Sequence, residues 1–97
     1  MFATIHDRRI QTITATAIEE VIRAVVVSYM ALYDLDGPDD INHGMCEDFA
    51  EDVCRLVSGA EGYWIDGSGR HKIIKYNGQY YDSECPNGVD NWRLLVR

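Results

Sequence analysis

Three residues that together support nucleophilic thiol chemistry are Cys46, His71 and Asp82. A thiol nucleophile needs a neighbour that accepts its proton, and an imidazole commonly does this. A carboxylate bound to the imidazole holds the ring in one orientation. The three residue types therefore form a candidate Cys-His-Asp set, whose geometry depends on the elements that carry it.

Cys46 stands where an irregular segment changes to a helical pattern. Within the stretch INHGMCEDFAEDVCRLV (41–57), apolar residues recur at helical spacing from Cys46 onward. Glu47 and Asp48 occupy the expected first turn, where negative charge complements the helix dipole. The pattern predicts a helix from near Met45, with Cys46 at its N-terminus and backbone N–H groups available to an oxyanion.

Asn77 and Gly78 are a strong hairpin signal, because a type I′ turn needs positive φ at both central residues. If they form the turn, counting outward places His71 opposite Glu84 and diagonal to Asp82. Side chains alternate along a strand, so all three project from the same face. The hairpin therefore predicts that a histidine and two carboxylates converge.

Further residues could serve this site. Asn42 or His43 is a candidate side-chain donor to an oxyanion, and Glu84 is a candidate orienting group. A zinc site built from Cys46, His71 and Cys85 is an alternative, but no C-x-x-C or H-x-x-x-H spacing supports it. The prediction is that no metal or other cofactor is required.

The remaining pattern predicts an α+β fold. Apolar periodicity predicts a first helix from about Ala17, where Thr16 and Glu19 have the spacing of a capping box, up to the acidic segment 34–40. Short aromatic and β-branched segments predict the strands YWI (63–65), HKIIKY (71–76), QYY (79–81) and WRLLV (92–96). We expect two N-terminal helices, then a small three- to four-stranded antiparallel sheet, in a single domain of residues 1–97.

The order of a Cys on a helix N-terminus, a His at the start of a strand and an Asp at the end of the next strand resembles the papain-like and transglutaminase-like cysteine hydrolase superfamily. The segments that carry the resemblance are GMCEDFA (44–50), HKIIKYNGQYYD (71–82) and, less specifically, Trp92. The resemblance implies a minimal transglutaminase-like core in which Cys46 is the nucleophile.

It further implies that His71 is the general base and acid, and that Asp82 orients the imidazole. The implied activity is that of a peptidase, amidase, deamidase or acyltransferase acting on a protein or peptide. Two features depart from the family pattern. Glu84 has no place in it, and the aromatic residue or Gln that often precedes the nucleophile is absent.

Charge points to a second class of function. The net charge is −7, from 16 acidic and nine basic residues, which disfavours direct binding of nucleic acid and favours a basic protein surface as partner. Size and charge resemble those of small bacteriophage accessory proteins, including anti-CRISPR proteins that block nucleic-acid-binding surfaces of host proteins. The acidic surface of such a non-catalytic binding protein would comprise Asp34, Asp36, Asp39, Asp40, Glu47, Asp48, Glu51 and Asp52.

Apolar runs and cysteines give expectations about compartment. The longest apolar run, residues 24–33, is too short to span a bilayer, and residues 1–11 lack a signal-peptide core. Three cysteines without a secretion signal indicate free thiols. We therefore expect a cytoplasmic protein that does not bind membranes, whose oligomeric state the pattern leaves open.

Overall fold

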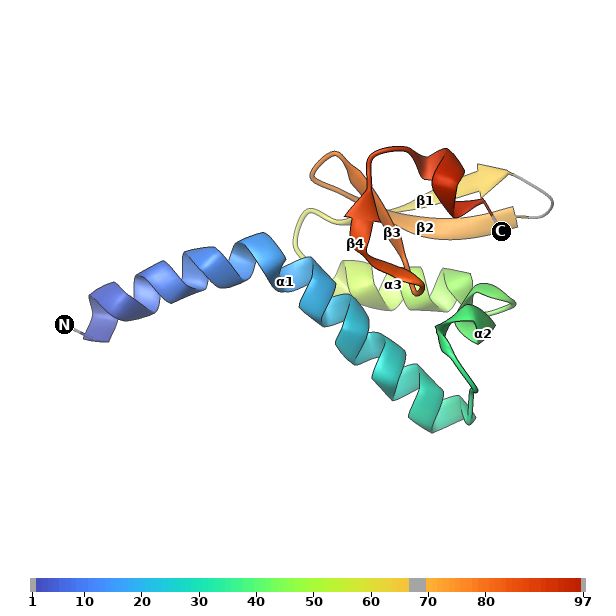
Figure 1. Cartoon of the computed structure of the whole chain (residues 1–97), viewed down its shortest axis with the longest axis horizontal. Helices are drawn as coiled ribbons and strands as arrows, with labels where there is room; N and C mark the ends of the chain where they lie inside the picture. Colours follow the sequence, from blue (N-terminus) through green and yellow to red (C-terminus); the bar gives the residue numbers. More distant parts are fainter. Residues whose placement is uncertain (1, 67–69, 97) are drawn as a thin grey trace.

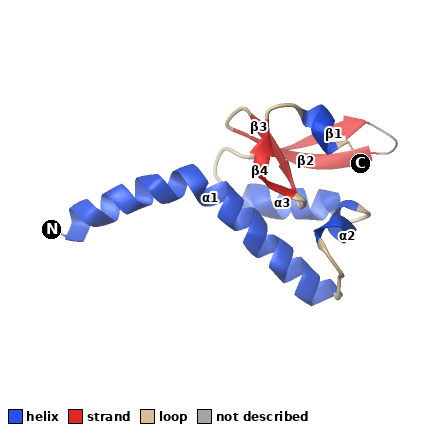
Figure 2. Cartoon of the chain, in the orientation of Figure 1, coloured by secondary structure: helices blue, strands red, loops and turns tan. Residues whose placement is uncertain are grey.

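The computed structural model describes the backbone of residues 2–66 and 70–96, and the side chains of residues 18–65 and 70–96. Within these ranges the helices are α1 (Phe2–Tyr33), α2 (Pro38–Asn42), α3 (Cys46–Leu56) and the 3₁₀ helix η1 (Trp92–Leu95). The strands are β1 (Glu61–Asp66), β2 (Arg70–Tyr76), β3 (Gln79–Asp82) and β4 (Cys85–Val89). They form one antiparallel sheet in the order β1-β2-β3-β4, which confirms the α+β class (Figures 1 and 2).

The sheet lies between two apolar clusters. The larger cluster joins the three α-helices to Ile74 and Tyr81 of the sheet, and the smaller one contains Ile65, Ile73 and Leu95. Because side chains alternate along a strand, the neighbours Ile73 and Ile74 serve opposite faces. The helices therefore cover one face and η1 the other, while the N-terminal half of α1 extends away from both (Figure 1).

The helical region differs from expectation in two places. Thr16 lies inside α1, so the predicted start at about Ala17 is wrong. Residues 2–16 contain neither Gly nor Pro, so the backbone carries no helix-breaking residue there. The short α2 was not predicted; Pro38 stands at its start, where its missing N–H costs no helical hydrogen bond. In the described part of the chain, no helix is both long and apolar enough to cross a bilayer.

The predicted hairpin is confirmed. Asn77 and Gly78 have φ values of 54° and 81°, and counting outward from them correctly pairs Ile74 with Tyr81. Strand β3 ends at Asp82. This endpoint decides the geometry of the candidate site.

The C-terminal strand prediction is wrong. Residues Trp92–Leu95 form η1, which begins with the Asn91 side chain accepting a hydrogen bond from the Arg93 amide at 3.0 Å. The fourth strand is instead Cys85–Val89, which the sequence pattern treats as a turn segment. This strand lies at the edge of the sheet, where Pro86 is tolerated despite its missing N–H.

Candidate functional site

His71 and Asp82 meet in the interior of the protein. The Nε2 atom of His71 lies 3.1 Å from Oδ2 of Asp82, and the two residues are 3% and 1% exposed. They come from β2 and from the last position of β3, diagonal to each other across the hairpin. The predicted convergence of this histidine and this carboxylate is therefore present in the fold.

The other ring nitrogen of His71 differs from Nε2 in its surroundings. Its Nδ1 atom is buried and has no hydrogen-bond partner among the described residues. An ionised carboxylate can only accept hydrogen bonds, so Asp82 favours the tautomer in which Nε2 carries the proton. In that tautomer Nδ1 presents a lone pair, which is the state that a general base requires.

A turn after β3 orients the carboxylate of Asp82. The backbone N–H of Glu84 donates to Asp82 Oδ1 at 3.0 Å, and the Glu84 side chain accepts a hydrogen bond of 2.7 Å from Asn42 Nδ2. The hydroxyl of Ser83 donates to the backbone oxygen of Pro38 at 2.7 Å. These bonds tie α2 to the turn and hold Asp82 in place.

The predicted pairing of Glu84 directly opposite His71 is wrong. Since β3 ends at Asp82, the next two residues form a turn rather than a continued ladder. Glu84 acts on the site through its backbone N–H and through Asn42 instead. Asn42, expected as an oxyanion donor, gives its Nδ2 to this carboxylate, and His43 is exposed with Nδ1 at 2.8 Å from the backbone oxygen of Asp39.

Cys46 contacts the strand that carries His71. Its Sγ atom lies 3.5 Å from the backbone nitrogen of Lys72 and accepts the hydrogen bond of that N–H. In an antiparallel hairpin, every second residue of a strand directs its backbone N–H to the same neighbouring strand. The backbone N–H of Lys72 therefore points toward β3, as that of Tyr76 does. Because β3 stops at Asp82, the sulfur takes the place of the missing ladder acceptor.

The sulfur therefore lies one peptide unit from the His71 backbone, since the Lys72 nitrogen is bonded to the carbonyl carbon of His71. The His71 side chain lies on the same face of the sheet as Ile73. The Lys72 side chain lies on the opposite face and reaches α3, where its Nζ is 3.3 Å from Glu51 Oε2. Cys46 thus reaches β2 at its hydrogen-bonding edge, between the two faces. In the part of the chain that the structure describes, Cys46 and His71 are adjacent without a direct hydrogen bond.

The other two cysteines differ from Cys46. Cys54 packs against the larger apolar cluster, and burial raises the pKa of its thiol above the ordinary 9.0. Cys85 begins β4 and pairs with Asp82 in the sheet register. Among the side chains of residues 18–65 and 70–96, no group of three from His, Cys, Asp or Glu is placed to hold a metal ion.

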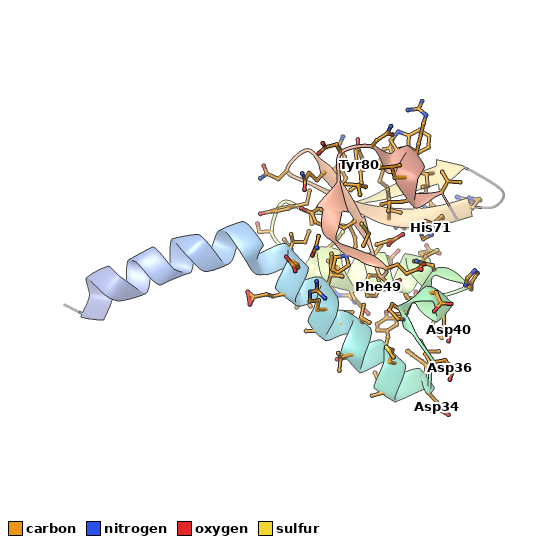
Figure 3. The ribbon with its side chains drawn as sticks, viewed as in Figure 1. Asp34, Asp36, Asp40, Phe49, His71 and Tyr80 are labelled. Carbon is orange, nitrogen blue, oxygen red and sulfur yellow. The ribbon has the colours of Figure 1, made fainter. Side chains whose placement is uncertain are left out.

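The acidic residues form a band along the α1–α2 connection, α2 and α3, and Figure 3 shows part of it at Asp34, Asp36 and Asp40. Two members are half-buried and have structural contacts. Asp40 accepts from the Asp36 amide at 2.9 Å, and Asp52 accepts from the Tyr29 hydroxyl at 2.5 Å and from Arg55. The exposed members are Asp34, Asp36, Asp39, Glu47, Asp48 and Glu51.

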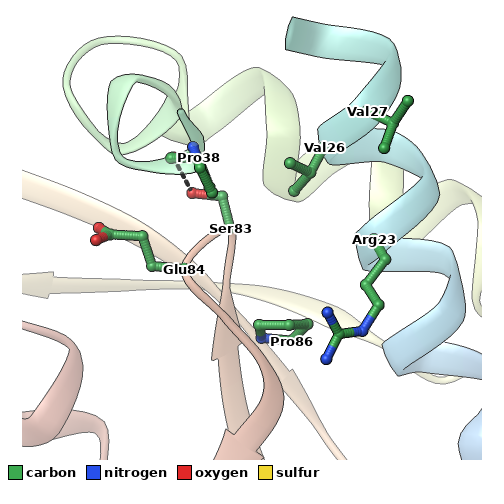
Figure 4. A pocket seen from close by; sticks show the side chains of 7 residues that line it. All are labelled: Arg23, Val26, Val27, Pro38, Ser83, Glu84 and Pro86. Atoms are coloured by element: carbon green, nitrogen blue, oxygen red, sulfur yellow. Dashed lines mark hydrogen bonds between the residues drawn. The ribbon is translucent and has the colours of Figure 1, made fainter. Parts of the chain in front are cut away.

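A cavity of about 440 Å³ lies beside the turn after β3, and Figure 4 shows its lining. Its walls are mostly apolar, with Val26 and Val27 on one side and Pro38 and Pro86 on the others. Cys46, His71 and Asp82 do not line it. The remaining wall residues are Arg23, Ser83 and Glu84. The cavity touches the site only through Ser83 and Glu84, and the Glu84 carboxylate points away from it (Figure 4).

Comparison with known proteins finds no matching family model, no matching curated protein and no matching solved structure. The site must therefore be interpreted from its own geometry. Sequence reasoning missed the roles of Ser83 and of the Lys72 amide. Counting outward from Asn77 and Gly78 places Ser83 opposite Lys72. A sequence signal that ended β3 at Asp82 would therefore have indicated that Ser83 belongs to a turn and that the Lys72 N–H needs another acceptor.

Proposed function

We propose that this protein is a small cysteine hydrolase or acyltransferase in which Cys46 attacks an amide or ester carbonyl. One observation carries the proposal. The His71 ring is held by Asp82 at Nε2, while its second nitrogen is buried, without a described partner, on the strand that the Cys46 sulfur contacts. A buried polar atom without a partner lowers the stability of the fold. The presence of such an atom at His71 therefore favours a role in chemistry.

In the proposed reaction, His71 Nδ1 accepts the thiol proton as the Cys46 sulfur forms a bond to the carbonyl carbon. The carbonyl oxygen becomes an oxyanion, stabilised by N–H groups at the start of α3. When the bond from carbon to the leaving nitrogen or oxygen breaks, His71 returns the proton to that atom. Water or a second nucleophile then resolves the thioester in the same way, and Asp82 stabilises each imidazolium.

The reaction requires the sulfur to move from the Lys72 amide toward Nδ1 of His71. Rotation about the Cα–Cβ bond of Cys46 is the simplest such movement, because the sulfur already lies beside the His71 peptide. Catalytic hydrogen bonds are often long in free enzymes and shorten when substrate binds.

The first test measures the rate at which iodoacetamide alkylates Cys46 as a function of pH, with peptide mass mapping to separate the three cysteines. We expect rapid labelling of Cys46 below pH 7 in the native protein and its loss in His71→Ala. Cys54 is an internal control on the same helix, because burial raises its pKa and should keep it slow at this pH. Labelling of Cys46 only after unfolding would refute the proposal.

The second candidate function, a non-catalytic acidic binding protein, is favoured by a different observation. Six carboxylates are exposed on adjoining elements, namely Asp34, Asp36, Asp39, Glu47, Asp48 and Glu51. Such a surface attracts a basic partner, and its binding should weaken steeply with added salt. Charge reversal at Asp36 and Asp39 should then abolish partner binding, whereas Cys46→Ala should leave it unchanged.

A further inference from the structure

Two buried side-chain atoms lack a hydrogen-bond partner among the described residues, namely His71 Nδ1 and Asn42 Oδ1. The proposed function uses the first and leaves the second unexplained. Asn42 is 8% exposed, so water in the bulk does not satisfy its oxygen. Buried polar atoms are satisfied in the great majority of native structures, and an exception calls for a missing partner.

The orientation of this amide is determined by its neighbour. Asn42 Nδ2 lies 2.7 Å from Glu84 Oε1, and an ionised carboxylate has no proton to donate. Exchanging the oxygen and nitrogen of the amide would therefore place two acceptors against each other. The buried atom of Asn42 that lacks a partner is its carbonyl oxygen, which is an acceptor.

The two residues that carry these atoms belong to one hydrogen-bonded chain. Asn42 binds Glu84, the Glu84 backbone N–H binds Asp82, and Asp82 binds His71. Asn42 also ends α2, four residues before Cys46 in the sequence, and it reaches the turn that follows β3. The residue with the unsatisfied acceptor and the residue with the base are therefore connected through the turn that follows β3.

We propose that Asn42 Oδ1 accepts a hydrogen bond from an N–H of the substrate, so that the site selects amides over the corresponding esters. This inference rests on the proposed thiol chemistry of Cys46. A site with a buried, unpaired acceptor favours a ligand that carries the N–H, because only that ligand supplies the acceptor with a partner.

The test uses two small alkylating probes that differ in this group, iodoacetamide and methyl iodoacetate. In both reactions the Cys46 thiolate forms a sulfur–carbon bond and iodide leaves. The rate constant at Cys46 is measured by peptide mass mapping and divided by that of N-acetylcysteine with the same probe. We expect native protein to favour iodoacetamide about three- to tenfold after this correction, the range that one neutral hydrogen bond supplies.

Substituting Asn42 should remove the preference. In Asn42→Leu, which is similar in size and has no acceptor, the corrected ratio should fall to one. Ser83→Ala is the matched control, because it removes the hydrogen bond that ties the turn to Pro38 and leaves the Asn42–Glu84 contact intact, so the preference should persist. An equal loss of preference in both variants would show that Asn42 only supports the turn, and would overturn the inference.

The native protein alone also tests the idea, independently of how the variants fold. A corrected ratio of one, with Cys46 reactive toward both probes, would refute the amide preference and leave the proposed thiol chemistry standing. Failure of native Cys46 to react with either probe would refute both. A preference for iodoacetamide in native protein that disappears in Asn42→Leu supports both.

Discussion

The two ends of α3 each carry a half-buried free cysteine, yet their surroundings differ. Cys46 begins the helix and accepts a hydrogen bond from a β2 amide beside His71. Cys54, about two turns further on, packs against the larger apolar cluster. Both positions fit the same apolar periodicity, so the helical pattern alone does not distinguish the two thiols.

Lys72 contributes to both ends in different ways. Its backbone N–H contacts Cys46, while its side-chain charge lowers the pKa of Cys54 without offsetting the burial and the charges of Glu61 and Glu51 that raise it. The neighbours that the sheet supplies therefore decide what each thiol can do. The following changes test how separate the two ends are.

The largest effect is expected from the cysteines themselves. Cys46→Ser should lower hydrolysis or acyl transfer at least about a thousandfold, because the hydroxyl is a far weaker nucleophile beside the same base. Cys54→Ser should change the rate less than about twofold. The measurement is turnover on a panel of peptide amides and esters, and equal losses in both variants would remove the distinction between the ends.

His71 and Asp82 should come next in order of effect. His71→Ala should reduce turnover by about a hundredfold or more, the usual contribution of a positioned general base. Asp82→Asn removes the charge that holds the imidazole. It should lower turnover by no more than His71→Ala does, and it should shift the pH–rate profile. A pH profile unchanged in Asp82→Asn would assign that residue a purely structural role.

A third change addresses the part of α3 between the two cysteines. Tyr29 packs edge-on against Phe49 and donates a 2.5 Å hydrogen bond to Asp52, so Tyr29→Phe should destabilise the fold by about 1 kcal/mol. Its effect on Cys46 alkylation should be negligible. Chemical denaturation with alkylation of the same samples checks both expectations, and a large drop in Cys46 reactivity would mean that the two ends are coupled.

The same tyrosine gives a pH dependence with a definite sign. Burial, followed by the charge of Asp48, raises the pKa of Tyr29 above its ordinary 10.0. A raised pKa in the folded state contributes stability at pH values below 10, and this contribution is lost as pH rises through the folded pKa. Native protein should therefore lose more stability than Tyr29→Phe between pH 10 and pH 12, measured by denaturant titration.

The smallest effect on the thiol is expected from the acidic band. Reversing Asp36 and Asp39 to lysine should leave the alkylation rate of Cys46 within about twofold at 0.15 M salt, where exposed charges are largely screened. The control is the same measurement at low salt, where weaker screening should let the charge reversal change the alkylation rate modestly. A large change at 0.15 M would join the acidic surface to the thiol site.

Predictability differed between local and long-range features. The hairpin at Asn77 and Gly78 followed from backbone chemistry, and with it the face shared by His71 and Asp82. The start of α3 followed from periodicity. By contrast, the residues 85–89 and 92–96 were assigned to the wrong elements, because a Pro-containing edge strand and a short apolar helix have weak local signals.

What the sequence determined by itself is the α+β class, the hairpin register and the pairing of His71 with Asp82. These depend on positive φ at two residues and on strict alternation, and both act over a few residues. The end of β3 at Asp82 and the docking of α3 with Cys46 against the Lys72 amide depend on packing between segments that are distant in the sequence. The buried acceptors of His71 and Asn42 belong to the same group, because packing between distant segments determines which polar atoms keep a partner.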